Sequence, residues 1–467
     1  MHSTLLFGAF ALMVGRAPDP AARAIIDTAL AHMGGLSAMA AVERVQLQVM
    51  TEWQRMDFDA RRTPVILSFE LSTELRDYTT PAWRYSRRFY SPNGTAEVID
   101  LVVDSVAAIG MNGRWRPQNV AYVDERDEVF TFAPERVVTL ARDAADARAL
   151  SDTSIAGVRY ASVAATIGHF RPTLYFRRSD GLLALARFRA GQPNDFGLAP
   201  WGAMDVEIAY SRWQKLADAG VVLPMQLDVS RVGRPYKRMT TISAKINPVI
   251  PPDSFAISDS LRSGFLATAR RPMFDLPMDS ARIVDGRFAV FGAPGTPTGA
   301  VKVGGHWLLI EAGTAPLTIE RSAAFLHRTD AGTPIDVALL TAPTGAGGIA
   351  WLARERVTTW VTEAAEPFAE GALRGWPVAG RPRLLGADRW LRIGTDSVRV
   401  ETIDLPDYPR TAVVYVPSLH WAFAWPAGPV QMDYIVAHAR RRGWQLDRIA
   451  SVRSFPGATI TPASAAR

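Results

Sequence analysis

The feature that most constrains this chain is a series of tight-turn dipeptides between short apolar or alternating runs, from residue 42 to about residue 255. The clearest of them are Asn93-Gly94, Asn112-Gly113 and Asp180-Gly181. Asn-Gly and Asp-Gly favour two-residue turns between antiparallel strands, because such turns need positive φ at their central positions. The sequence therefore predicts an antiparallel sheet of successive hairpins. Strands are expected at 173–178, 182–190, 205–210, 221–229 and 239–246.

Two helices are expected to accompany this sheet. Residues 21–39 carry apolar side chains at helical spacing from Ile25 to Met33, and Gly34-Gly35 is a typical helix-ending pair. Residues 134–150 read as a second helix, with Pro134 in its first turn. A proline cluster at 247–255 closes this part, and the following stretch to residue 279 lacks clear periodicity, as a linker does.

The pattern changes beyond this stretch to strands that alternate with helices. Strands are expected at 287–292, 300–305, 306–313, 336–341, 357–362, 411–417 and 448–454. Helices are expected at 318–329, after the glycine loop that ends at Gly348, and at 430–442. Such alternation is typical of a layered α/β domain. We therefore expect a two-domain chain of the α+β or α/β class, in which an antiparallel sheet with helices precedes a layered sandwich.

Composition excludes several classes of protein. The chain has 467 residues, enough for two to three domains, and no cysteine, which removes disulfides, thiolate metal sites and a cysteine nucleophile. The net charge is +6, but the arginines are scattered among acids and form no stripe, so nucleic-acid binding is not expected. No run of 18 apolar residues occurs, so no internal transmembrane helix is expected.

The N-terminus carries a ten-residue apolar run, Leu5–Val14. This length suits the core of a secretory signal and is too short to span a bilayer. We expect residues 1–22 to be a signal peptide, with cleavage near Ala22, and the protein to be periplasmic or secreted. A buried first helix of a cytoplasmic protein, or a start codon assigned too far downstream, is the alternative.

The order of landmarks after Ile283 resembles the metallo-β-lactamase fold, the αββα sandwich of zinc hydrolases. A strand pair opens at Asp285-Gly286, the strand at 306–313 ends in an acid and a glycine, and the strand at 335–341 ends in threonine. Residues 413–423 are similar to the family's strand–proline–hairpin. The first part, with its double glycine and the stretch 210–224, resembles exported bacterial proteins that join a lipoprotein-like sheet domain to this fold. The resemblance implies domains at 23–256 and 283–467, with a linker at 257–282.

The loop that should hold zinc has lost its ligands. The family reads T-H-x-H-x-D-H-x-G-G here, whereas this chain has Thr341-Ala342-Pro343-Thr344-Gly345-Ala346-Gly347-Gly348. Ala342 and Thr344 stand where two imidazoles are expected, and Ala346 stands where the catalytic acid is expected. Two later ligand positions fall at Pro426 and Pro456. Zinc needs three or four nitrogen, sulfur or carboxylate ligands, so the resemblance implies a degenerate site with no cofactor and no catalytic residue.

Other chemistry has weaker support in the sequence. Asp407, His420 and His438 could form a metal site outside the family pattern only through tertiary proximity. The strand, glycine loop and helix around Gly347, with Glu363 after the next strand, imitate a dinucleotide-binding turn without its spacing. Exposed amides of the same loop could instead hold an anionic group at the helix N-terminus.

Acidic and aromatic residues of the first domain offer further candidate sites. Two carboxylate pairs, Asp100 with Asp104 and Asp124 with Asp127, are expected to be solvated. Four aromatic residues of the first domain could line an apolar groove, although core packing is the favoured role. These are Trp53, Tyr85, Phe89 and Tyr90.

Three functional hypotheses remain. The favoured one is a non-catalytic member of the resembled fold that binds a small apolar or anionic ligand or a protein partner in the bacterial envelope. The second is an active hydrolase with a non-standard metal site. The third is a structural envelope component that acts through its N-terminal sheet.

Overall fold

The computed structural model describes most of the chain in twelve segments. These are 19–54, 68–91, 94–191, 203–270, 281–291, 298–313, 316–342, 346–374, 381–406, 408–424, 429–451 and 459–463. The apolar run expected to be a signal lies outside these segments. Within them, no helix has both the length and the apolar character needed to cross a membrane.

The N-terminal unit is built on one thirteen-stranded sheet with the order β6-β5-β4-β3-β2-β1-β13-β12-β11-β10-β9-β8-β7. Its strands are β1 (Arg44–Trp53), β2 (Ser68–Asp77), β3 (Ala82–Ser91), β4 (Gly94–Val103), β5 (Val106–Met111), β6 (Arg114–Pro117), β7 (Arg148–Ile155), β8 (Val158–Ala164), β9 (Thr173–Arg177), β10 (Leu183–Gly191), β11 (Ala203–Lys215), β12 (Val222–Arg231) and β13 (Arg234–Ile246). Neighbours along this order pair antiparallel, and the pairing of β1 with β13 joins the two series of hairpins.

The predicted hairpin turns are confirmed where the structure describes them. Asn112 and Gly113 have φ of 49° and 78° between β5 and β6, the double positive φ that an Asn-Gly turn provides. Asp180-Gly181 lies between β9 and β10, with Gly181 at φ 70°. Asn93 lies outside the described residues, although the flanking strands β3 and β4 pair as expected.

The helices of this unit agree with the prediction in part. The first helix, α1 (Pro20–His32), ends before the predicted glycine pair, where Gly34 has φ 113°, and a short helix α2 (Leu36–Ala40) follows this pair. Between β6 and β7 the sequence predicted one helix to Leu150, but the chain forms α3 (Ala121–Phe132) and α4 (Pro134–Asp143). The stretch from Arg148 pairs with β8 instead, so strand pairing overrides the helical pattern there.

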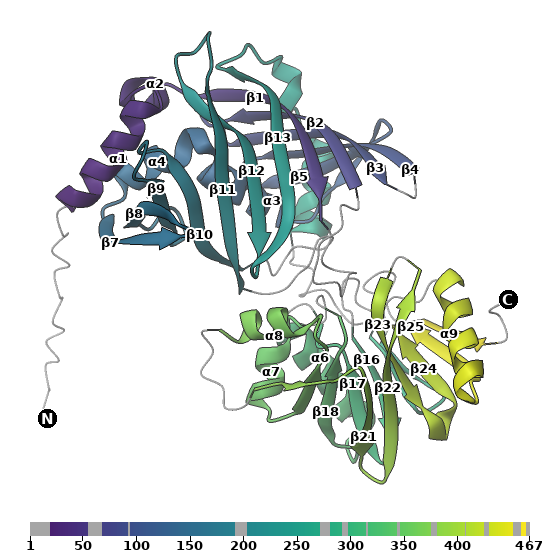
Figure 1. Ribbon diagram of the computed structural model, residues 1–467. Coiled ribbons are helices and arrows are strands. Elements are labelled where there is room, and N and C mark those ends of the chain that lie inside the picture. The colour runs from purple at the N-terminus through teal and green to yellow at the C-terminus, as the bar shows by residue number, and fades with distance from the viewer. Residues whose placement is uncertain are drawn as a thin grey trace, which may run out of the picture.

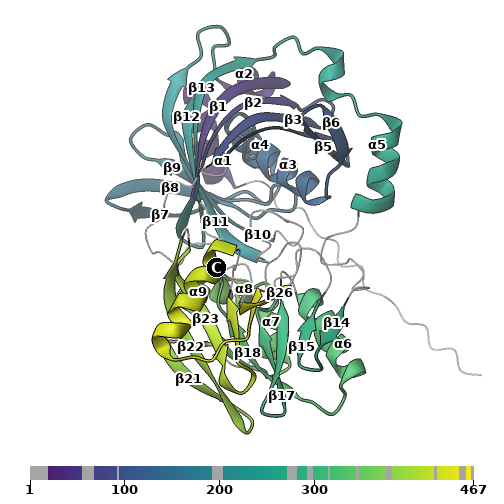
Figure 2. The same ribbon diagram turned by 90° about the vertical axis from the view of Figure 1, so that its right-hand side faces the viewer.

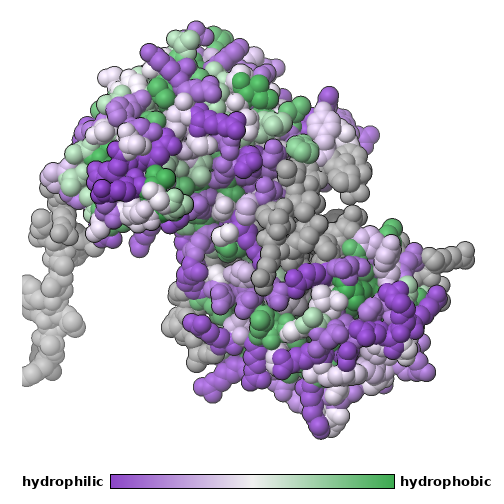
Figure 3. Space-filling view, in the orientation of Figure 1, coloured by the Kyte–Doolittle hydropathy of each residue, from purple (hydrophilic) through white to green (hydrophobic). Residues whose placement is uncertain are grey.

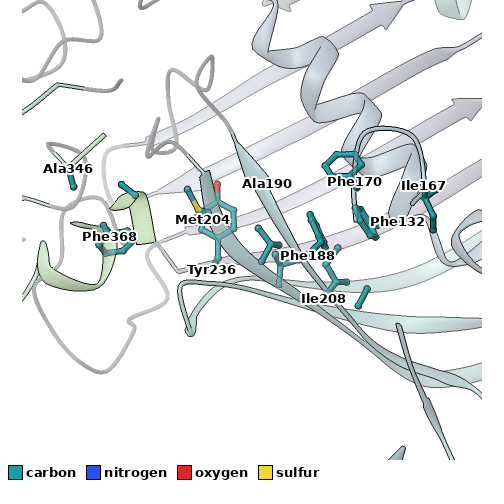
Figure 4. Packing of buried hydrophobic residues seen from close by; sticks show 14 of the residues in the cluster. Phe132, Ile167, Phe170, Phe188, Ala190, Met204, Ile208, Tyr236, Ala346 and Phe368 are labelled. Atoms are coloured by element: carbon teal, nitrogen blue, oxygen red, sulfur yellow. The ribbon is translucent and has the colours of Figure 1, made fainter. Parts of the chain in front are cut away.

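The sheet curves around α3 and α4, as Figures 1 and 2 show. Three phenylalanines, from α3, the β8–β9 connection and β10, pack together in this interior. Phe132 stacks on Phe188 at 3.8 Å between ring centroids and meets Phe170 edge-on at 5.1 Å. Figure 4 shows these side chains gathered on the helix-facing side of the sheet.

The segment 257–282, expected to be a linker, contains the helix α5 (Asp259–Gly264) and a helical turn at Phe265–Ala269. Phe265 is buried against Trp83, Tyr85 and Val106 of the N-terminal unit. The first part of this segment therefore packs on the N-terminal sheet.

The C-terminal unit contains two sheets. The first has seven strands, β14 (Arg282–Val284), β15 (Phe288–Val290), β16 (Gly299–Val303), β17 (His306–Ile310), β18 (Ile335–Leu340), β19 (Thr358–Val361) and β20 (Arg383–Leu384), paired in chain order. The second has six, β21 (Asp388–Ile393), β22 (Asp396–Leu405), β23 (Tyr408–Val416), β24 (Trp421–Ala424), β25 (Arg448–Ser451) and β26 (Thr459–Pro462). Strands β17 to β20 are parallel, and the helices α6 (Pro316–Thr329) and α7 (Ile349–Arg354) connect them.

The two sheets face each other across an apolar layer. Phe288, Leu308 and Leu339 of the first sheet pack with Val414 and Phe423 of the second. The helices α6, α7 and α8 (Glu366–Leu373) pack on the outside of the first sheet, and α9 (Pro429–Arg442) packs on the outside of the second. The C-terminal unit is therefore a four-layer sandwich of helices, sheet, sheet and helix. Figure 3 shows that the outward face of this unit seen in Figure 1 is mainly hydrophilic.

Candidate functional site

The loop after β18 is anchored by a buried carboxylate. Glu311 follows β17 and Thr341 follows β18, and because these strands are adjacent and parallel their carboxyl ends meet at one edge of the sheet. The Glu311 carboxylate accepts hydrogen bonds from the Thr341 amide at 2.9 Å, the Ala342 amide at 3.4 Å and the Thr341 hydroxyl. The Thr362 hydroxyl donates to the Thr341 carbonyl at 3.1 Å. The start of the loop is thus fixed from two sides.

Burial controls the charge of this carboxylate. Glu311 has no solvent exposure, and burial raises its pKa from 4.5 to about 7, although the hydrogen bonds from Thr341 and Ala342 act in the opposite direction. The side chain cannot reach a substrate. Its role in this arrangement is to position the loop.

The other described residues of the loop are small and buried. Ala342 and Ala346 are 4% and 0% exposed, and Gly347 and Gly348 are buried. A Cβ on Gly348 would lie 2.0 Å from the Ala312 carbonyl oxygen, so the loop packs directly on the end of β17. These side chains offer no nitrogen, sulfur or carboxylate donor, so they do not fit a zinc ion.

Three of the predicted ligand positions lie outside the described residues. They are Thr344, Pro426 and Pro456. Asp407 of the alternative metal site lies outside them too. Within the part of the chain that the structure describes, no three metal-ligating side chains come together.

The two histidines of that alternative site have separate acidic partners. His420 Nδ1 lies 3.2 Å from Asp447, and His438 Nε2 lies 2.9 Å from Glu401. The structure therefore does not bring these histidines into one cluster.

The nucleotide and anion hypotheses for the same loop gain no geometric support. The helix α7 is only six residues long, and its first four residues, 349–352, are buried. Gly347 is buried as well, so it presents no exposed amide to an anion. Glu363, the residue placed on a ribose by the nucleotide hypothesis, pairs with Arg410 at 2.6 Å.

The aromatic groove, which the sequence offered as the alternative to core packing, is not formed by Trp53, Tyr85 and Tyr90. Trp53 and Tyr85 are buried on the inner face of the sheet, whereas Tyr90 is 37% exposed and belongs to the opposite face by strand alternation. The side chain of Phe89 lies outside the description. The inner face beside Tyr85 is charged and does not form an apolar groove.

Asp100 illustrates this charge, and the expectation that it is solvated was wrong. It is 1% exposed and pairs with Arg87 Nη2 at 2.8 Å. Burial raises the pKa of Asp100 from 3.8 to about 6, although Arg87 lowers it. Glu70 accepts a hydrogen bond from the Tyr85 hydroxyl beside this pair.

A second buried network lies further along the same face. Arg76 donates to both oxygens of Glu74 at 2.8 and 2.9 Å and to Glu135 of α4 at 3.0 Å. All three side chains are at most 5% exposed. Sequence reasoning missed both networks, although the alternation of polar side chains from Glu70 to Arg76 was the available signal.

The geometry defines an α+β chain in which a curved antiparallel sheet encloses helices and a four-layer sandwich follows. No family model matches the sequence, and no curated protein matches it either.

Several solved structures match parts of this chain. A LolA superfamily protein from Nitrosomonas europaea is 11% identical and covers 50% of this chain and 97% of its own, with a TM-score of 0.33. A metallo-β-lactamase from Pontibacter korlensis is 15% identical and covers 39% of this chain and 93% of its own, with a TM-score of 0.31. The sec-alkylsulfatase Pisa1 from a Pseudomonas species is 10% identical and covers 39% of each chain, with a TM-score of 0.30.

Proposed function

We propose that this chain is a non-catalytic binding protein of the bacterial envelope, whose C-terminal sandwich has no hydrolytic metal site and which binds a ligand or a protein partner. The observation that carries the proposal is the loop between β18 and α7. Its described positions Ala342, Ala346, Gly347 and Gly348 hold small, buried residues where a metal-binding loop needs imidazoles and a carboxylate.

The packing of the loop supports this reading beyond the residue types. A catalytic zinc needs an open coordination position for water or substrate. The methyl group of Ala346 is fully buried, and Gly348 is in contact with the Ala312 carbonyl. The described residues of the loop are therefore packed against the protein itself and leave no open coordination position.

The metal content of the protein tests the proposal. The full chain, untagged, is loaded with zinc, desalted and measured by plasma mass spectrometry, beside the His420→Ala and His438→Ala variants. We expect zinc near background in all three proteins. About one zinc per wild-type chain, lost in either variant, would establish the alternative of a non-standard metal site and contradict the proposal.

The location in the envelope is proposed from the apolar run at Leu5–Val14. Expression of the full chain in a bacterium, followed by fractionation and N-terminal sequencing, tests it. We expect a periplasmic or secreted product that has lost about the first 22 residues, and a cytoplasmic product when Ala9 is replaced by arginine. An uncleaved cytoplasmic wild-type protein would contradict the location without affecting the metal result.

A further inference from the structure

A pocket of about 190 Å³ lies at the outer edge of the seven-stranded sheet, between α7, α8 and the strands β19 and β20. Its walls combine three arginines with apolar side chains. The arginines are Arg356, Arg381 and Arg383, and the apolar side chains include Ile349, Val357 and Leu373. The volume is about six times the share of one water molecule in the liquid, about 30 Å³. It can admit an oxoanion with a short substituent.

The described residues of the protein do not balance the charge of this pocket. None of its described lining residues is an aspartate or glutamate. Among the residues that the structure describes, no carboxylate pairs with Arg356, Arg381 or Arg383. By contrast, Arg354, two residues before Arg356, pairs with Glu355 at 2.9 Å and with Glu320 at 3.8 Å.

The structure fixes the backbone of one of these arginines and shows where the guanidinium of another lies. Arg356 follows the end of α7 at φ 60°, and its amide donates to the Ala353 carbonyl at 3.2 Å. The left-handed conformation is unfavourable for a residue with a side chain, and such strain concentrates at functional positions. The Arg383 guanidinium lies 5.4 Å from the ring centre of Trp360, on the face of the sheet that packs against the second sheet, so its charge lies away from α7 and α8. A cation–π contact orients a guanidinium without neutralising it.

A basic residue near the end of a helix also complements the helix dipole. Arg354 already occupies the last turn of α7, so the dipole accounts for one cation there. The helix dipole does not account for Arg381 and Arg383, which come from β20 and the residues just before it.

We propose that this pocket binds a small molecule that carries a phosphate or sulfate group, with its substituent against Val357 and Leu373. Guanidinium groups bind such oxoanions through paired hydrogen bonds, and the two unbalanced cations Arg356 and Arg381 favour a doubly charged group. The inference rests on the proposed binding function and names its ligand class.

Titration calorimetry of the full chain at low salt tests the site, with inorganic phosphate, phenyl phosphate and phenol as probes. We expect saturable binding of both phosphates and none of phenol. Tighter binding of phenyl phosphate than of inorganic phosphate would assign the site to an ester, and equal binding would assign it to the free oxoanion. Either result supports a site that binds the phosphate group.

The variants Arg356→Gly and Arg381→Gln are expected to weaken phosphate binding about tenfold or more, because each loses charge-assisted hydrogen bonds. Glycine suits the left-handed position of Arg356, so that variant keeps the fold while it removes the charge. The matched control is Arg354→Gln, which removes a charge from the same helix outside the pocket and is expected to leave binding unchanged.

Two results would overturn the site. One is the absence of saturable phosphate binding, and the other is an equal loss of binding in Arg354→Gln and Arg356→Gly. Zinc content measured on the same preparation separates this failure from that of the proposed function. Bound zinc would contradict the non-catalytic reading whatever the phosphate result.

Discussion

At the scale of single residues, Glu311 couples the loop after β18 to pH. Its pKa in the folded chain is about 7, against 4.5 in the unfolded chain, so the folded state holds the proton more tightly. Stability from this group is therefore greatest below about pH 4.5 and is lost as pH rises to about 7. Between pH 5 and pH 8 we expect the free energy of unfolding to fall by about 2–3 kcal/mol through Glu311 alone.

The Glu311→Gln variant, which cannot ionise, should show a flatter dependence of stability on pH over this range, measured by urea unfolding at half-unit steps. Asp100 contributes a slope of the same sign up to about pH 6, and it is present in both proteins. Glu355→Gln, an exposed replacement, is the control. Parallel curves for wild type and Glu311→Gln would show that the carboxyl ionises normally.

Gly348 is a second residue with a defined role, because the loop packs closely against the end of β17 at this position. Its φ of −88° suits any residue, so the obstacles to a side chain are steric: the Ala312 carbonyl oxygen lies 2.0 Å and the Ile319 Cγ2 atom 2.8 Å from the Cβ position. We expect Gly348→Ala to lower the free energy of unfolding by about 1–3 kcal/mol through overpacking. Gly332→Ala is the control, since no atom lies within 4 Å of its Cβ position. Equal thermal midpoints for the two variants would contradict the tight packing of the loop.

At the scale of elements, β2 is unusual because its inner face is polar. Glu74 and Arg76 are buried there with Glu135 of α4, while Phe69 and Leu71 are 47% exposed on the opposite face. Removal of Arg76 would leave two buried carboxylates without their cation. We expect Arg76→Met to cost about 3–5 kcal/mol near pH 7 in chemical denaturation, and less at acid pH where the carboxyl groups take up protons.

The control for Arg76 is Arg187→Met, which breaks an exposed pair with Glu207. Surface pairs contribute little, so this variant should remain close to wild type. If Arg76→Met lowered the free energy of unfolding as little as Arg187→Met does, the buried carboxylates would be stabilised without the arginine.

The elements that the sequence predicted well are those fixed by local chemistry. The turn at Asn112-Gly113 needs only the positive φ that these two residues favour, and the glycine pair that divides α1 from α2 acts in the same local way. The helix α3 was missed because five consecutive charged residues, 124–128, hide its buried side. Arg126 in this run is 6% exposed and donates to the carbonyls of Pro81 and Asp104, partners supplied only by the folded sheet.

At the candidate site, too, features fixed by local chemistry could be predicted, whereas features that depend on the fold could not. That Ala342 and Ala346 carry no metal-binding group is a matter of residue type and can be read directly. The raised pKa of Glu311 and the three arginines of the α7–β20 pocket depend on burial and on residues that are distant in sequence. Asp100 was placed on the surface for the same reason, because its burial follows from the pairing of β3 with β4 and from Arg87.

At the scale of the whole molecule, the two units meet through α8. Arg189 of β10 donates from Nη2 to the carbonyls of Gly371 and Arg374, at 2.6 and 2.8 Å, where α8 ends. The Arg374 side chain pairs with Asp205 of β11, and a Cβ on Gly371 would lie 3.2 Å from Val232. Figures 1 and 2 both place α8 beside the ends of β10 and β11. The helix that borders the arginine-lined pocket is therefore held by the N-terminal sheet.

This contact predicts that the N-terminal unit stabilises α8. Two hydrogen bonds from a charged donor contribute about 1.5–3 kcal/mol each, so Arg189→Ala should speed hydrogen exchange of the α8 amides about tenfold or more. The strands β22 to β24, which do not touch Arg189, should exchange at the wild-type rate. Arg159→Ala, an exposed change on β8, is the control and should leave α8 unchanged. Unaltered exchange in α8 of Arg189→Ala would show that the helix is held by its own unit alone, because its packing beside α7 would then suffice without the N-terminal sheet.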